Sequence, residues 1–74
     1  MIKTLKPREI QVLKEIIKGS TNKEIAQNLN ISLASVKFYI SSIFEKLEVT
    51  SRVTAAVKGL ELLDQNIKQK EARA

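Results

Sequence analysis

Residues 19–40 contain two helix starts that are separated by a very short turn. Thr21 and Glu24 have the spacing of a capping box, in which each side chain accepts the other's backbone N–H, and they predict a helix over residues 22–29. Ser32 can cap a second helix over residues 33–47. The turn at residues 30–32 leaves Ile31 to enter the core. This layout is that of a helix-turn-helix motif.

The flanking segments predict one further helix on each side of this motif. Pro7 suits the first position of a helix over residues 7–18, and Gly19 suits its end. Thr50 or Ser51 can cap a fourth helix that runs to about residue 67. The 74 residues, with two glycines and one proline, therefore predict one all-α, four-helix domain over residues 1–74. Its core spans about residues 5–67, and the tail at residues 68–74, which has no apolar pattern, is expected to fray.

The composition excludes several classes of function. The chain has no cysteine and no histidine, so it lacks disulfides, thiolate metal sites and the commonest general base. It offers no nucleophile–base pair, phosphate loop or metal cluster, and we expect no enzyme activity, no metal, no cofactor and no small-molecule ligand. No apolar run reaches the length of a membrane span and no signal peptide begins the chain, so a cytoplasmic location without membrane contact is expected. The net charge of +5 makes nucleic acid a candidate partner.

The predicted helix over residues 33–47 has an apolar face that is expected to enter the core and an opposite, outward face that carries Phe38. Its core face is formed by Val36, Ile40, Ile43 and Leu47. Phe38 points nearly straight away from that face, which is mildly unfavourable unless something covers the ring. We expect the ring to pack against thymine methyl groups in the major groove, and Lys37 on the flank to reach a guanine edge or a phosphate. An incidental exposed aromatic and a solvated lysine are the alternatives.

The fourth helix carries two stripes. The wider stripe is predicted to face the core and consists of Val53, Ala56, Val57, Leu60, Leu63 and Ile67. The narrower stripe includes Ala55, Gly59 and Leu62. A glycine in the middle of a helix costs about 1 kcal/mol relative to alanine, so its presence needs a reason. We predict that this narrower stripe is the seam of a two-fold dimer that places two copies on adjacent half-sites.

Several spaced motifs together resemble the LuxR/GerE/NarL-type DNA-binding domain of bacterial transcription regulators. They run from residue 5 to about residue 56 and comprise residues 5–13, Gly19, residues 22–26, Ile31-Ser32, residues 35–37, residues 46–49 and Ser51-Arg52. The resemblance implies a four-helix fold in which the third helix reads DNA and the fourth pairs protomers. It implies a stand-alone regulator or the C-terminal effector domain of a response regulator. Such a protein would be located with the nucleoid and would change transcription through contact with RNA polymerase or obstruction of it.

The resemblance also implies roles for individual residues. It implies phosphate contacts by Asn22, Lys23 and Lys46, and it supports DNA contacts by Ser35 and Lys37. With Phe38 and Ser41 on the same outward face, these residues are our predicted base-reading set, although Tyr39 and Ser41 depart from the residues that the family usually has there. Arg52 is the family's recurrent arginine. Because Glu9 lies within the apolar arc of the first helix, and an unpaired buried charge is unfavourable, we predict an ion pair between Glu9 and Arg52. An exposed Glu9 at the start of the helix is the alternative.

A second interpretation belongs to another class of function. A basic helical module could use Phe38 and the surface of the fourth helix to bind a protein partner. Such a module would show little salt dependence and no retention on DNA. DNA binding would weaken steeply as salt rises, so a titration at two salt concentrations separates the two interpretations.

Overall fold

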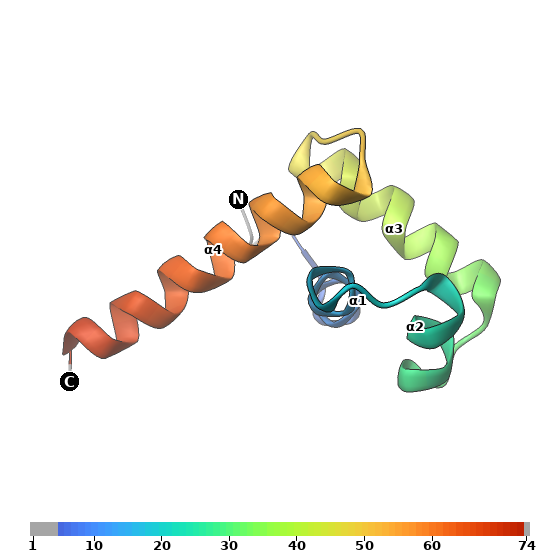
Figure 1. The fold of residues 1–74 in the computed structure, drawn as a ribbon, viewed down its shortest axis with the longest axis horizontal. Coiled ribbons are helices and arrows are strands. Elements are labelled where there is room, and N and C mark those ends of the chain that lie inside the picture. The colour runs from blue at the N-terminus through green and yellow to red at the C-terminus, as the bar shows by residue number, and fades with distance from the viewer. Residues whose placement is uncertain (1–4, 74) are drawn as a thin grey trace.

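The computed structural model describes the backbone of residues 5–73 and the side chains of residues 5–63. Within that part of the chain there are four helices and no strand: α1 (Pro7–Lys18), α2 (Asn22–Leu29), α3 (Leu33–Leu47) and α4 (Arg52–Arg73). The first three helices have the predicted bounds. Figure 1 shows α1 between the other helices, α2 and α3 on one side of it, and α4 crossing over it and continuing outward as a long arm.

Side-chain caps begin the helices of the motif as predicted. The Thr21 hydroxyl accepts the Glu24 N–H at 3.1 Å, and the Glu24 carboxylate accepts the Thr21 N–H at 2.8 Å. Ser32 Oγ accepts the Ser35 N–H at 3.0 Å and so caps α3. At the end of α1, Gly19 has a φ of 89°, in the left-handed region that glycine adopts without steric cost.

The fourth helix begins as predicted but is longer. Ser51 Oγ accepts the Thr54 N–H at 3.1 Å, which confirms Ser51 as the capping residue. The helix then continues to Arg73, beyond the predicted end near residue 67 and through most of the tail that was expected to fray. Residues 60–73 contain neither glycine nor proline, and their leucine, lysine, glutamine and glutamate residues favour helix, so nothing local stops it.

One core joins the four helices. Leu13 of α1, Ile25 of α2 and Ile43 of α3 are fully buried in it. On α3 the predicted core face is confirmed, with Val36, Ile43 and Leu47 buried and Ile40 half-buried. Tyr39 and Phe44 border this face and pack against the core. In the described part of the chain, no helix is both long and apolar enough to cross a membrane.

The predicted orientation of α4 is wrong. Ala55 and Gly59 face the core and are buried, and Leu62 is half-buried against it, so these three residues do not form an exposed dimer seam. A Cβ atom at Gly59 would lie 2.8–2.9 Å from three side-chain atoms of Leu13. The small residues are therefore needed because α4 crosses α1 closely.

Part of the stripe that was assigned to the core instead faces outward, although Ala56 does pack against the core and Leu63 is half-buried. The exposed fractions of Val53, Val57 and Leu60 are 73%, 55% and 56%. A hydrophobicity count favours the wider apolar arc as the buried one. In this helix the available space at α1 decides the orientation, and it admits alanine and glycine rather than valine and leucine. Ile67 lies outside the side chains that the structure describes.

Candidate nucleic-acid interface

The outward face of α3 presents the side chains that were predicted to read bases. Phe38 has an exposed fraction of 68%, and Lys37 and Ser41 are also exposed. The Phe38 ring meets the Tyr39 ring edge to face, with centroids 5.7 Å apart and an interplanar angle of 68°. Because Tyr39 packs against the core, this contact limits the positions that the exposed Phe38 ring can take.

The N-terminal end of this face is held by the helix cap. Ser35 is half-buried, and its hydroxyl oxygen accepts a hydrogen bond from Ser32 Oγ at 2.9 Å. The Ser35 hydroxyl keeps its own proton to donate. Ser35 therefore lies at the start of the exposed face with one remaining donor.

Phe38, Ser41, Ser42 and Glu45 line a shallow hollow further along α3. The hydroxyl of Ser42 donates to Glu9 Oε2 at 2.6 Å, so it is engaged inside the protein. Glu45 is exposed at the end of the hollow that is farther from the N-terminus of α3. The apolar and uncharged part of the face thus lies around Phe38 and Ser41, and the acid lies one to two turns beyond.

The first turn of α2 presents a second group of donors. The capping box satisfies the N–H groups of Thr21 and Glu24, which leaves the N–H groups of Asn22 and Lys23 without an intrahelical acceptor. Lys23 is exposed beside them, and Asn22 is half-buried. Free N–H groups, a lysine and the positive end of the helix dipole are a combination that attracts anions.

The predicted Glu9–Arg52 ion pair is wrong, because Glu9 is paired with Lys46 instead. Lys46 Nζ lies 2.8 Å from Glu9 Oε1, and this oxygen also accepts the Lys6 N–H at 2.8 Å. Together with the Ser42 hydroxyl, these groups hold a carboxylate that is only 3% exposed. Ser42 and Lys46 are four residues apart and lie on one face of α3, which is the signal that could have identified the partner.

These contacts determine the protonation of Glu9. Burial alone would raise the pKa of its carboxyl, but hydrogen bonds from Lys46, Ser42 and the Lys6 N–H outweigh burial and lower the pKa from 4.5 to about 2. Glu9 is therefore ionised at neutral pH. It balances the charge of Lys46, whose side chain is 28% exposed, so this lysine is less available to an external phosphate than Lys23 is.

Arg52 at the start of α4 contacts the beginning of α2. Its Nη1 donates to Asn22 Oδ1 at 2.7 Å, and its Nη2 donates to the Ser20 carbonyl oxygen at 2.7 Å. The sequence carried no signal for this pairing, since residues 22 and 52 belong to different helices. The arrangement places a guanidinium fork directly behind one of the expected phosphate contacts.

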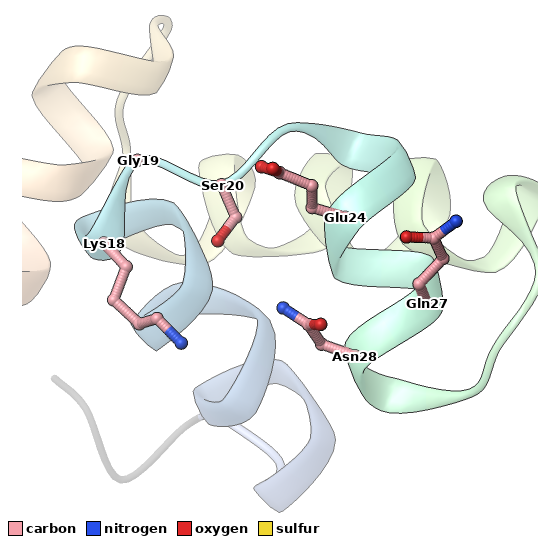
Figure 2. Close-up of a pocket in the computed structure, with 6 residues that line it drawn as sticks. All are labelled: Lys18, Gly19, Ser20, Glu24, Gln27 and Asn28. Carbon is pink, nitrogen blue, oxygen red and sulfur yellow. The ribbon is translucent and has the colours of Figure 1, made fainter.

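A polar hollow lies between α1 and α2, and Figure 2 shows the side chains of Ser20 and Asn28 pointing into the same space. Both donate to Glu15 Oε1, at 2.8 Å and 2.9 Å. These hydrogen bonds, with the Lys18 ammonium, lower the pKa of the buried Glu15 carboxyl. Two of the side chains that line the hollow are thus hydrogen-bonded to the Glu15 carboxylate, and the Asn28 bond ties α2 to α1.

The exposed residues of α4 form an apolar surface. Val53, Val57 and Leu60 are spaced so that they lie on one side of the helix. Beside them is an apolar hollow between the end of α1 and the start of α4, lined by Ile16, Gly19, Arg52, Val53, Ala56 and Val57. We call Val53, Val57 and Leu60 the outer face of α4.

No metal centre is found among the residues that the structure describes. Within that part of the chain, no three His, Cys, Asp or Glu side chains come together in a way that could hold an ion. Every buried side-chain nitrogen or oxygen there has a hydrogen-bond partner. Within the described residues, no buried side-chain nitrogen or oxygen is left unsatisfied in a way that would suggest a missing ligand.

The chain is similar in sequence to known bacterial regulatory proteins. The family described as "Bacterial regulatory proteins, luxR family" matches residues 3–58. The transcriptional regulatory protein ComA of Bacillus subtilis is 47% identical over 53 residues, which are 72% of this chain and 25% of ComA. The nitrate/nitrite response regulator protein NarP of Escherichia coli is 46% identical over 57 residues, 77% of this chain and 26% of NarP. The chain thus spans about a quarter of the length of these relatives.

A solved structure shares the fold. It is the response regulator ComA DNA-binding domain, in a crystal structure with the anti-activator RapF. The two folds agree with a TM-score of 0.72 at 45% sequence identity, over 74% of this chain and 95% of the other. The match confirms the predicted all-α helix-turn-helix architecture.

Proposed function

The chain belongs to the luxR family of bacterial regulatory proteins, as the sequence motifs indicated, and we propose that it binds double-stranded DNA sequence-specifically as the DNA-binding domain of a transcription regulator. In this proposal α3 enters the major groove as the recognition helix. The first turn of α2 contacts the phosphate backbone. Two copies pair through α4 and occupy two half-sites.

The observation that carries this proposal is the exposed face of α3. A soluble helix would be expected to present polar side chains opposite its core face, and here it presents an aromatic ring with an exposed fraction of 68%. Lys37 and Ser41 flank the ring and can donate to base edges. The face has no acid until Glu45, so its first three turns suit a surface of negative potential.

The Phe38 contact can be tested by removing single methyl groups from DNA. A bound duplex is first selected from a random pool, and each thymine is then replaced by deoxyuridine, which lacks only the C5 methyl group. We expect one replacement to weaken binding of the wild-type protein by about five- to tenfold, as for one lost apolar contact. The Phe38→Ala variant should be insensitive to the same replacement. Equal sensitivity of both proteins at every thymine would refute the contact.

The phosphate contact rests on Lys23 and Asn22. Lys23 is exposed beside two backbone N–H groups that have no intrahelical acceptor, whereas Lys46 is paired with Glu9. Phosphate contacts carry no sequence information and release counterions. Loss of Lys23 should therefore weaken binding to all sequences alike and reduce the dependence of affinity on salt.

The proposed dimer uses the outer face of α4 rather than the predicted seam. This face leaves two valines and one leucine more than half exposed, next to an apolar hollow that the same face of a second copy could cover. An interface of this size is small, so pairing should be weak without DNA and should become measurable on a duplex with two half-sites. Sedimentation of a single copy on such a duplex would contradict it.

DNA-binding experiments also distinguish the proposed function from the alternative, a protein-interaction module. ComA is solved in complex with RapF, so a domain of this fold does bind a protein. For this chain, DNA binding predicts an affinity that falls linearly in log–log form with salt. If the protein does not bind DNA even at low salt, the result favours the protein-interaction module.

A further inference from the structure

Arg52 makes two short hydrogen bonds that join the start of α4 to the start of α2. One goes to Asn22 Oδ1 and the other to the Ser20 carbonyl oxygen, both at 2.7 Å. Resting on the proposed function, we propose that Arg52 is a positioning residue for DNA binding, which orients the Asn22 carboxamide so that its NH₂ group can donate to a phosphate.

The orientation of Asn22 follows from the chemistry of its partner. A guanidinium group has only donors, so the carboxamide atom that faces Arg52 must be the oxygen. The NH₂ group is on the other branch of the same planar amide and is directed away from Arg52. Within residues 5–63, no hydrogen bond occupies this NH₂ group, although Asn22 is half-buried. Arg52 thus consumes the acceptor of Asn22 and leaves its donors available.

The second hydrogen bond adds rigidity to the same place. The Ser20 carbonyl lies just before Thr21, which caps α2, so Arg52 holds both the chain that enters α2 and the first residue of the helix. The planar guanidinium group of an arginine donates to two acceptors at once in a fixed geometry. A lysine ammonium at the end of a flexible side chain does not fix the positions of two acceptors in this way. Without Arg52, the Asn22 amide could rotate and present its oxygen, which repels a phosphate.

The test is a double-mutant cycle in DNA affinity. Asn22→Ala should weaken binding to any duplex by about tenfold, the effect of one hydrogen bond to a charged group. Arg52→Ala should cause a similar loss, and the double variant should bind no more weakly than either single variant. If Arg52 contacted phosphate itself, or acted only through overall stability, the two losses would multiply.

Lys58→Ala is the matched control. Lys58 is also a cation on α4 that donates to a carbonyl of another helix, that of Leu47 at 3.0 Å, but it does not contact Asn22. Its loss should reduce affinity less than twofold and should multiply with the loss from Asn22→Ala. An equal loss from Lys58→Ala and Arg52→Ala would show that only the charge matters and would overturn the inference.

Folding is followed by thermal melts of every variant. If Arg52→Ala shows no cooperative melt, Arg52→Lys replaces it in the cycle. Arg52→Lys should bind DNA more weakly than the wild type, and it should cause no further loss of affinity in the Asn22→Ala background. Absence of salt-dependent binding by the wild-type protein would refute the proposed function itself. Intact wild-type binding with losses that multiply would refute the role of Arg52 alone.

Discussion

Replacing Gly59 with alanine tests which side of α4 faces the core. The added Cβ atom would lie 2.8 Å from Leu13 Cδ1 and 2.9 Å from both Cδ2 and Cγ. Leu13 is fully buried, so its side chain cannot move out into solvent to make room. Overpacking of this kind costs about 1–3 kcal/mol, whereas the change from glycine to alanine within a helix contributes about 1 kcal/mol in the opposite direction.

The net effect is a destabilisation of about 1 kcal/mol, which for a domain of this size lowers the melting temperature by about 4–8 °C. Circular dichroism melts of the two proteins measure it directly. If Gly59 instead faced outward, as the sequence pattern suggested, the helix propensity would act alone and the melting temperature would rise by a similar amount. A rise would therefore refute the close packing of α4 on α1.

A second background isolates the contact with Leu13. The Leu13→Ala substitution removes all three atoms that the new Cβ would meet, at a cost of about 2–5 kcal/mol, so these melts require a stabilising osmolyte. In this background Gly59→Ala should become stabilising, because only helix propensity and partial filling of the cavity remain. The same sign in both backgrounds would show that the effect of Gly59→Ala does not come from Leu13.

Three further predictions concern the surface and the buried ion pair. Lys23→Ala should lower the slope of log affinity against log salt by about 1 per protomer, and Lys14→Ala on the exposed side of α1 should leave it unchanged. Val57→Asp should leave the melting temperature nearly unchanged, because Val57 is 55% exposed, but should abolish pairing on a two-half-site duplex in sedimentation. The pKa of Glu9 is about 2 in the folded protein and 4.5 as the reference for the unfolded chain, so its carboxylate contributes about 3 kcal/mol above pH 4.5, and this contribution is lost as pH falls toward 2. Glu9→Gln should be less stable than the wild type at neutral pH, and the difference in unfolding free energy should shrink across that range; a constant difference would contradict the lowered pKa.

The sequence was sufficient for the features that depend on neighbouring residues. The bounds of α1, α2 and α3 were predicted from Pro7, Gly19, the Thr21–Glu24 capping box and Ser32. These signals act through hydrogen bonds within a few residues, so a single sequence contains them completely. The core face of α3 and the exposure of Phe38 follow from the period of one helix and were predicted for the same reason.

The contacts between helices were not predictable in this way. The Glu9–Lys46 and Asn22–Arg52 contacts join residues that are far apart in the chain, and Arg52 was assigned to Glu9 from the sequence because the relative positions of the helices were not yet known. The Arg52 contact connects the first turn of α2, which is proposed to bind phosphate, to α4, which is proposed to pair two copies.

The sequence by itself thus determined where the helices of the motif begin and end, which family the chain resembles and which residues of α3 lie on its outward face. Only the tertiary structure decided which side of α4 is buried and which partner each charged group takes. The physical reason is the same in both cases. Hydrophobic periodicity describes one helix in isolation, whereas the distance between two packed helices selects small residues such as Gly59 at the crossing, and the positions of all four helices select the partners of Glu9 and Arg52.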